Sequence, residues 1–137
     1  MASKELLDGL QHALNREVGT FLRYMLQASM IKGIENQPVR QMYESEVADE
    51  TGHAQYLANK IVMLGGSPKL DPDLTPPPTE VKAMLKNDIS EEHKDVEHYK
   101  KLADLADKDS LIELKLQMED QAADEERHAL DMERLLG

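Results

Sequence analysis

Residues 50–53, ETGH, and residues 125–128, EERH, decide the fold that this sequence predicts. Each stretch places a Glu and a His three positions apart, so both side chains lie on one face of a helix. Two further glutamates, Glu17 and Glu92, each precede one of these motifs by 33 residues. A shift of 75 positions maps the first Glu and its motif onto the second Glu and its motif. The chain is therefore predicted to consist of two similar helical hairpins related by a pseudo-twofold axis.

Turn and capping signals divide the chain into four long helices. Ser3 is the predicted N-cap of the first helix, and Thr79 that of the third. Ser110 and Glu113 form a predicted capping box that opens the fourth. The expected helices run from Ser3 to Ile31, from Pro38 to Leu64, from Thr79 to Ala106, and from Ser110 to the last residues.

The segment between the second and third helices is long and cannot be helical. Residues 65–78, GGSPKLDPDLTPPP, contain five of the six prolines. A segment of this length can follow the whole bundle, which makes the second and third helices parallel. Each helix has one apolar stripe at spacings of three and four, and four such faces make a bundle. We expect an all-α four-helix bundle with one long crossover, forming a single domain over residues 1–137.

Six polar residues occupy stripe positions where a bundle core needs apolar side chains. They are Glu17, Glu50, His53, Glu92, Glu125 and His128. A buried carboxylate without a partner costs many kcal/mol or takes up a proton. Two divalent cations carry four positive charges, which balance four carboxylates. The residues therefore predict a dinuclear metal site with bridging carboxylates and open positions for a small oxidant.

The donor types indicate the metal. Carboxylate and imidazole donors without sulfur suit iron or manganese, and the chain has no Cys. Zinc could occupy the same site without redox chemistry. The competing interpretation, buried polar residues tied into salt bridges, lacks basic partners, because no Lys or Arg lies on the third stripe. Glu91 adjoins Glu92, and only the stripe phase and the 75-residue repeat select Glu92.

Composition limits the partners. The net charge of −11 argues against a nucleic acid or an anionic membrane, either of which needs a basic patch. It is compatible with attracting cations, although solubility is the simpler role. No stretch approaches the ~18 apolar residues of a membrane span, and the first ten residues do not resemble a signal peptide. A cytoplasmic protein is expected.

The chain resembles the ferritin-like di-iron proteins over essentially its whole length, and its pattern is most similar to that of the bacterioferritins. Two helices that give one Glu each, and two that give Glu-x-x-His, form the ligand set of that class. The resemblance rests on Glu17 followed by Tyr24, on ADETGHAQYL at 48–57, on EEHKDVEHYKKLADLAD at 91–107, and on DEERHALDMERLL at 124–136.

The resemblance implies a role for each of these residues. Glu17 and Glu92 would be terminal ligands, one for each of two iron ions. Glu50 and Glu125 would bridge the ions, and the two sites would be completed by His53 and His128. Tyr24 matches a tyrosine near the iron pair that could donate an electron. A core tyrosine hydrogen-bonded to a carboxylate is the alternative.

Departures from the bacterioferritin pattern bear on haem and on assembly. Thr51 stands where the family has a haem-ligating Met, so haem is not expected, although Met25 is another methionine that could serve. The sequence ends at Gly137 without the fifth helix of the 24-subunit ferritins. A homo-oligomer is therefore expected to be a 12-subunit shell or a dimer. The lysine-rich N-terminal tail of the DNA-protecting 12-subunit proteins is absent.

Three functions fit these residues. The leading hypothesis is a ferroxidase for iron storage and detoxification, which oxidises Fe²⁺ to Fe³⁺ with O₂ or H₂O₂. The alternative is a rubrerythrin-like di-iron peroxidase or oxidase with an external electron donor and no mineral storage. A pure iron carrier or structural metal bundle is the third.

Residues outside the main site could also meet cations. Four acids expected to be exposed could guide Fe²⁺, with solvated surface as the simpler role: Glu46, Asp49, Asp120 and Glu126. An accessory ion at Glu91, His93, Glu97 and His98 is less favoured than a solvated face.

Overall fold

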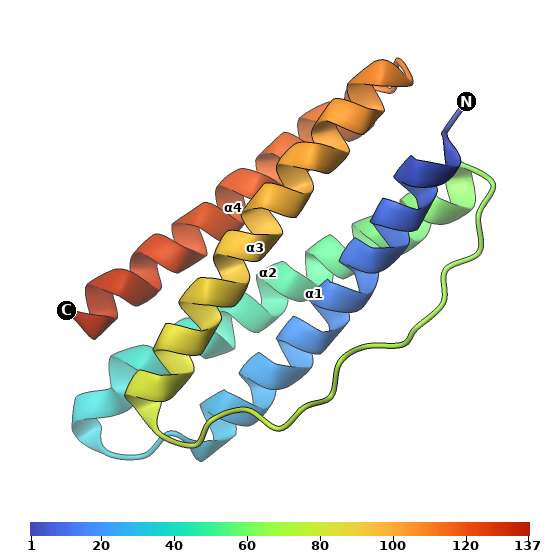
Figure 1. Ribbon diagram of the computed structural model, residues 1–137. Coiled ribbons are helices and arrows are strands. Elements are labelled where there is room, and N and C mark those ends of the chain that lie inside the picture. The colour runs from blue at the N-terminus through green and yellow to red at the C-terminus, as the bar shows by residue number, and fades with distance from the viewer.

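The computed structural model describes residues 1–137 as four long α-helices and one short 3₁₀ helix (Figure 1). Helices α1 and α2 form one antiparallel hairpin, and α3 and α4 form the other. The second and third helices run in the same direction. The predicted all-α four-helix bundle with one long crossover is therefore confirmed. The bounds are α1 Lys4–Met30, η1 Ile34–Asn36, α2 Gln37–Met63, α3 Val81–Lys108 and α4 Ile112–Leu136.

The helix starts follow the predicted signals only in part. The Ser3 side chain accepts a hydrogen bond from the Leu6 N–H at 3.1 Å, as expected for an N-cap. Thr79 does not cap α3. The Glu80 carboxylate does so instead, accepting from the N–H groups of Lys82 at 2.8 Å and Ala83 at 3.2 Å. A longer acidic side chain one position later thus replaces the predicted hydroxyl cap.

The predicted capping box of α4 is wrong because Ser110 ends the preceding helix. Ser110 has a φ of 60°, the left-handed conformation. Its N–H bonds the Asp107 carbonyl, and the next N–H, that of Leu111, bonds the Ala106 carbonyl. This is the double hydrogen bond that closes a helix C-terminus. Glu113 accepts instead from the Tyr56 hydroxyl and from a lysine of α2.

The crossover follows α1 along the bundle (Figure 1). Two amide side chains of α1 hold its backbone. Asn15 donates to the Lys69 carbonyl at 3.0 Å, and Gln11 accepts from the Lys69 N–H at 3.2 Å. A Cβ on Gly19 would lie only 3.2 Å from the Asp73 carbonyl oxygen, so the crossover approaches α1 closely there. These contacts satisfy backbone groups that an extended segment cannot satisfy by itself.

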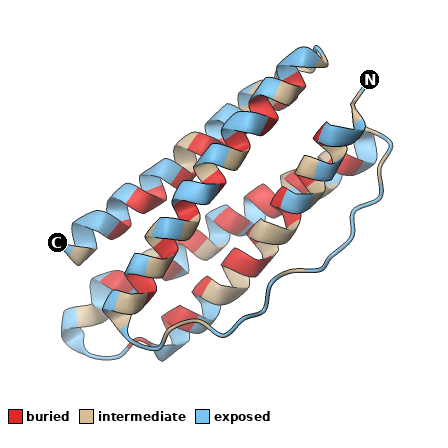
Figure 2. Ribbon diagram, in the orientation of Figure 1, coloured by how far each residue is buried: buried red, intermediate tan, exposed pale blue.

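The core consists of two apolar clusters with a polar layer between them. The buried faces of the helices point inward throughout (Figure 2). The larger cluster includes Leu57, Leu102 and Met118, and the smaller includes Tyr43 and Met132. The six polar stripe residues lie between the clusters and are at most 7% exposed. None of the helices has the length and hydropathy that crossing a lipid bilayer requires.

The cap of α3 can be tested by substitution. Glu80→Ala should lower the free energy of unfolding by about 1 kcal/mol, because two N–H groups lose their acceptor. Thr79→Ala is the matched control and should change it by less than about 0.5 kcal/mol. Urea denaturation of both variants measures the difference. A larger loss in the Thr79 variant would contradict the cap seen here.

Candidate metal centre

The structure brings all six predicted ligand residues together at the middle of the bundle. Helices α1 and α3 supply one Glu each, and α2 and α4 supply one Glu and one His each. Their donor atoms form two groups, each with all atoms within 4.8 Å of one another. The groups are Glu17, Glu50, His53 and Glu125, and Glu50, Glu92, Glu125 and His128. Glu50 and Glu125 belong to both groups, so they lie where the two groups meet.

Many polar atoms of this cluster have no hydrogen-bond partner in the protein. Both oxygens of Glu50 and of Glu125, one oxygen each of Glu17 and Glu92, and Nδ1 of both histidines are buried without a hydrogen bond. Buried polar atoms are nearly always paired, so a concentration of unpaired donors marks a site for a ligand. Carboxylate oxygens and imidazole nitrogens are donors that iron accepts. The residues present therefore fit a di-iron site.

An aspartate on the opposite helix holds each histidine of the cluster. Nε2 of His53 lies 2.9 Å from Oδ2 of Asp124, and Nε2 of His128 lies 3.2 Å from Oδ2 of Asp49. When Nε2–H donates to the aspartate, the Nδ1 lone pair faces the cluster. Nδ1 of His53 is 3.2 Å from a Glu125 oxygen, but the geometry is not that of a hydrogen bond. Such carboxylate–histidine pairs orient metal-binding imidazoles.

The contacts of these two aspartates with the histidines were not predicted from the sequence. Asp124 was not singled out, and Asp49 was expected only as an acid that guides cations. The signal was present, since each immediately precedes a glutamate shared by both donor groups, in the repeated pattern Asp-Glu-x-x-His. The 75-residue shift maps Asp49 onto Asp124.

Without metal, protons compensate the charge of this cluster. Burial, together with the nearby Glu17 carboxylate, raises the pKa of Glu50 and of Glu125 well above the ordinary range. Burial lowers the pKa of His128, but its contacts with Glu50 and Glu92 outweigh burial and raise the pKa to about 12. The metal-free cluster therefore retains protons that divalent cations would displace.

Two tyrosines bond the outer glutamates across the hairpins. The Tyr24 hydroxyl of α1 donates to Oε1 of Glu92 on α3. The Tyr99 hydroxyl of α3 donates to Oε1 of Glu17 on α1. Tyr24 thus lies beside the cluster, where the resemblance placed it. Tyr99, its equivalent after the 75-residue shift, had no predicted role.

The inner face of α3 differs from the prediction. Asp88 and Asp95 are buried, whereas Ile89 and Val96 are only partly buried, although the stripe spacing of three and four around Glu92 predicts both in the core. The reason lies on α1, where arginines compensate these two acids. Arg23 bonds Asp88 at 2.8 Å. Asp88 also accepts from Gln27 and Tyr43, both at 2.6 Å.

Arg16 separates Glu91 from the cluster. It bonds Asp95 at 2.7 Å and the Glu91 carboxylate at 2.8 Å. Glu91 therefore lies at the surface of the bundle, while Glu92 is fully buried and faces the other cluster residues. The helical phase that selected Glu92 thus agrees with its position in the structure.

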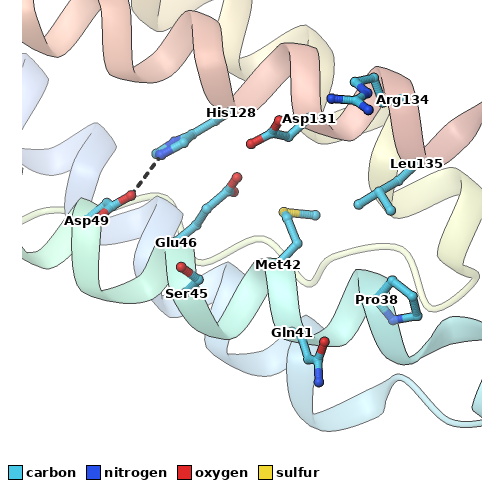
Figure 3. Close-up of a pocket in the computed structure, with 10 residues that line it drawn as sticks. All are labelled: Pro38, Gln41, Met42, Ser45, Glu46, Asp49, His128, Asp131, Arg134 and Leu135. Atoms are coloured by element: carbon cyan, nitrogen blue, oxygen red, sulfur yellow. Dashed lines mark hydrogen bonds and ion pairs between the residues drawn. The ribbon is translucent and has the colours of Figure 1, made fainter.

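Glu46 lies in a pocket beside the cluster, and its expected exposure is wrong, since it is only 4% exposed. Figure 3 shows its carboxylate between α2 and α4, near those of Asp131 and Asp49 and beside His128. The pocket has a volume of about 570 Å³. One Glu46 oxygen has no hydrogen-bond partner, and burial raises the pKa of Glu46 to about 9. The other three proposed guiding acids are exposed, as expected.

The structure does not assemble the accessory cluster of α3. His93 is exposed and lies 3.4 Å from a Glu133 oxygen, and Glu97 pairs with Lys100. His98 lies against the Gly9 carbonyl instead. The accessory-ion interpretation therefore gains no support, and the solvated-face interpretation fits these contacts.

Residues 7–137 match the ferritin family model, which is described as a ferritin-like domain. A curated bacterial ferritin from Pseudomonas aeruginosa is 29% identical over 85 residues, which is 62% of this chain and 55% of the relative. The aligned part therefore spans only about half the length of that relative.

Two solved structures are similar to the chain in both fold and sequence. A ferritin-like di-iron-carboxylate protein from Bacillus anthracis has a TM-score of 0.93 and 36% identity, covering 98% of this chain and 96% of that one. A dodecameric thioferritin from Bacteroides fragilis, described as bacterioferritin-related, has a TM-score of 0.88 and 26% identity. That match covers 97% of this chain and 84% of the thioferritin chain.

The buried Glu46 predicts a pH-dependent gain of stability on substitution. Its pKa is about 9 when folded and near the ordinary 4.5 when unfolded. Between these values the folded protein keeps a proton that the unfolded chain has released, so stability falls as pH rises. Glu46→Gln removes this loss and should stabilise the metal-free protein at pH ~8 by on the order of 1–3 kcal/mol. At pH ~4 the gain should vanish.

The repeat suggests that glutamine fits this position, because Gln121 is the buried residue equivalent to Glu46 after the 75-residue shift. Glu44→Gln, on the exposed face of the same helix, is the matched control and should show no such gain. Urea denaturation at several pH values measures both. A gain for Glu46→Gln that is the same at every pH would refute the assigned titration.

Proposed function

The chain belongs to the ferritin family, and we propose that it is a ferroxidase that oxidises Fe²⁺ to Fe³⁺ with O₂ or H₂O₂. The observation that carries this proposal is the pair of overlapping donor groups that share Glu50 and Glu125. A site that holds two Fe²⁺ ions side by side can deliver two electrons to one oxidant molecule. The carboxylates balance the charge of the substrate ions, which lowers the cost of moving them out of water.

In this proposal each donor has a defined task. Glu17 and Glu92 each bind one ion, and Glu50 and Glu125 bridge the two. His53 and His128 complete the sites through Nδ1, held in that orientation by the aspartates on Nε2. Tyr24, bonded to Glu92, is positioned to donate an electron during oxidation.

We also propose a path for the substrate ion. The Glu46 pocket opens beside His128, and acids from α2 and α4 line it. Carboxylates that face such a recess raise the local concentration of cations. Fe²⁺ would pass Asp49 and Glu46 before it reaches the cluster.

Iron storage is the proposed purpose of the reaction. We propose that residues 1–137 act as one ferritin-like domain and that copies assemble into a 12-subunit shell or a dimer. The Bacteroides fragilis relative is dodecameric, which supports the larger assembly. Iron is the proposed metal, with manganese or zinc as possible substitutes. No haem is proposed, because Thr51 directs its hydroxyl to the Val47 carbonyl at the position of the expected Met.

An aerobic titration of the metal-free protein with Fe²⁺ tests this function. Oxidation is followed by absorbance, and the iron that co-elutes with the protein is then measured. A ferroxidase with a storage shell should oxidise Fe²⁺ faster than buffer and keep many more than two ions per chain in solution. If uptake saturates near two ions per chain and the excess precipitates, the storage function is contradicted. A di-iron peroxidase or oxidase then becomes the better assignment.

A substitution in the cluster shows whether this centre is responsible. Glu50→Ala removes a donor common to both groups, so oxidation should fall to the rate of buffer. The variant should fold, because it deletes a buried acid that destabilises the metal-free protein. Glu44→Ala, on the exposed face of α2, is the control and should retain full activity. Unchanged iron binding by the Glu50 variant would mean that the centre lies elsewhere.

A further inference from the structure

We infer that Tyr99 is a second electron-donating residue of the centre, equivalent to Tyr24 on the opposite side, an inference that rests on the proposed ferroxidase function. The two phenols make the same contact in opposite directions. Tyr24 donates from α1 to the outer glutamate of α3, and Tyr99 donates from α3 to the outer glutamate of α1. A role that follows from the first contact applies equally to the second.

The surroundings of Tyr99 suit oxidation. Its side chain is 2% exposed and closes the larger apolar cluster, as Tyr24 closes the smaller. Its ring lies 6.5 Å from that of His53, a residue of the cluster, in an edge-on arrangement. The chain contains no Trp and no Cys, so tyrosine is the readily oxidised side chain available beside the site. An oxidised Tyr99 would also be shielded from reactants in solvent.

The number of electrons gives the second tyrosine a purpose. Reduction of O₂ to two waters needs four electrons, and two Fe²⁺ supply only two. Tyr24 and Tyr99 supply the other two, each losing one electron and one proton from its hydroxyl. The balanced step is O₂ + 2 Fe²⁺ + 2 TyrOH + 2 H⁺ giving 2 Fe³⁺ + 2 TyrO• + 2 H₂O. Each phenol donates its hydrogen bond to a glutamate, which is the first acceptor for the proton that the oxidised tyrosine loses.

Further substrate restores the tyrosines. Two more Fe²⁺ reduce the two phenoxyl radicals, which regain their protons from solvent. The complete cycle is O₂ + 4 Fe²⁺ + 4 H⁺ giving 4 Fe³⁺ + 2 H₂O. A centre with both tyrosines therefore releases no H₂O₂, whereas a centre with neither reduces O₂ only to H₂O₂.

The test compares Tyr24→Phe, Tyr99→Phe and the double variant with the unmodified protein, each loaded with two Fe²⁺ per chain and mixed with O₂. Freeze-quench electron paramagnetic resonance counts the radicals, and a peroxidase-coupled assay measures released H₂O₂. Each single variant should keep at most half of the tyrosyl signal, because one of two equivalent donors remains. The fourth electron then comes from a further Fe²⁺, so that O₂ + 3 Fe²⁺ + TyrOH + 3 H⁺ gives 3 Fe³⁺ + TyrO• + 2 H₂O. The double variant should lose the signal and release the most H₂O₂.

Controls separate this inference from loss of the site. Binding of Co²⁺, which O₂ does not oxidise there, should stay at two ions per chain in all variants. Tyr56→Phe, a substitution at the surface of α2, should change neither readout. Labelling the unmodified protein with ring-deuterated tyrosine should narrow the radical signal, which identifies it as tyrosyl. A signal of more than one spin per chain in this unsubstituted protein would show that a second tyrosine is oxidised.

Two results would overturn the role of Tyr99. One is a Tyr24→Phe variant that gives no tyrosyl signal and as much H₂O₂ as the double variant. The other is a Tyr99→Phe variant that matches the unmodified protein in both readouts. In either case the ferroxidase function stands if Fe²⁺ is still oxidised faster than in buffer. Oxidation no faster than buffer in the unmodified protein would instead defeat the proposed function itself.

Discussion

Four buried glutamates with no Lys or Arg paired with them are the constraint on which this structure depends. Each lies on the inner face of its helix and is at most 1% exposed. A carboxylate in such a place needs a cation or a proton. The arginines of α1 do not meet that need, because they pair with Asp88, Asp95 and Glu91 outside the cluster. The negative charge of the four glutamates must therefore be balanced by protons or by cations from solution.

The same layer joins the two hairpins. Tyrosine–glutamate contacts connect α1 with α3, and histidine–aspartate contacts connect α2 with α4. Each contact occurs twice, once in each direction, as the 75-residue repeat requires. The apolar clusters on both sides keep water away from the buried tyrosine–glutamate pairs and so strengthen them. Helix packing and site geometry are thus one arrangement rather than a scaffold with an added centre.

The repeat also explains what sequence analysis could and could not predict. Features present in both halves were readable: the four helices, the six cluster residues and Tyr24. The crossover occurs only once and was readable from its prolines. Asp49, Asp124 and Tyr99 obey the same repeat and were readable too, but only as partners of other side chains. The buried aspartates of α3 break the repeat and were missed. Asp88 corresponds to Ala13, and its burial depends on Arg23, a contact between helices that a single stripe does not encode.

Local signals failed where two elements compete for one residue. Serine is a residue type preferred at N-caps, yet Ser110 lies in the tight turn between α3 and α4 and ends α3. Glutamate is usually a surface residue, yet Glu46 is buried because its side chain lies between α2 and α4. Both outcomes depend on tertiary contacts. Neither affects the cluster residues, whose positions follow from helical phase alone.

The central claim is that the cluster binds two adjacent metal ions. Anomalous diffraction at the iron edge, from crystals soaked in Fe²⁺ without oxygen, tests this claim most directly. The account predicts two peaks per chain at the middle of the bundle, one in each donor group, with Glu50 and Glu125 contacting both. Peaks only at the surface, with the histidines still turned to the neighbouring glutamates, would contradict it.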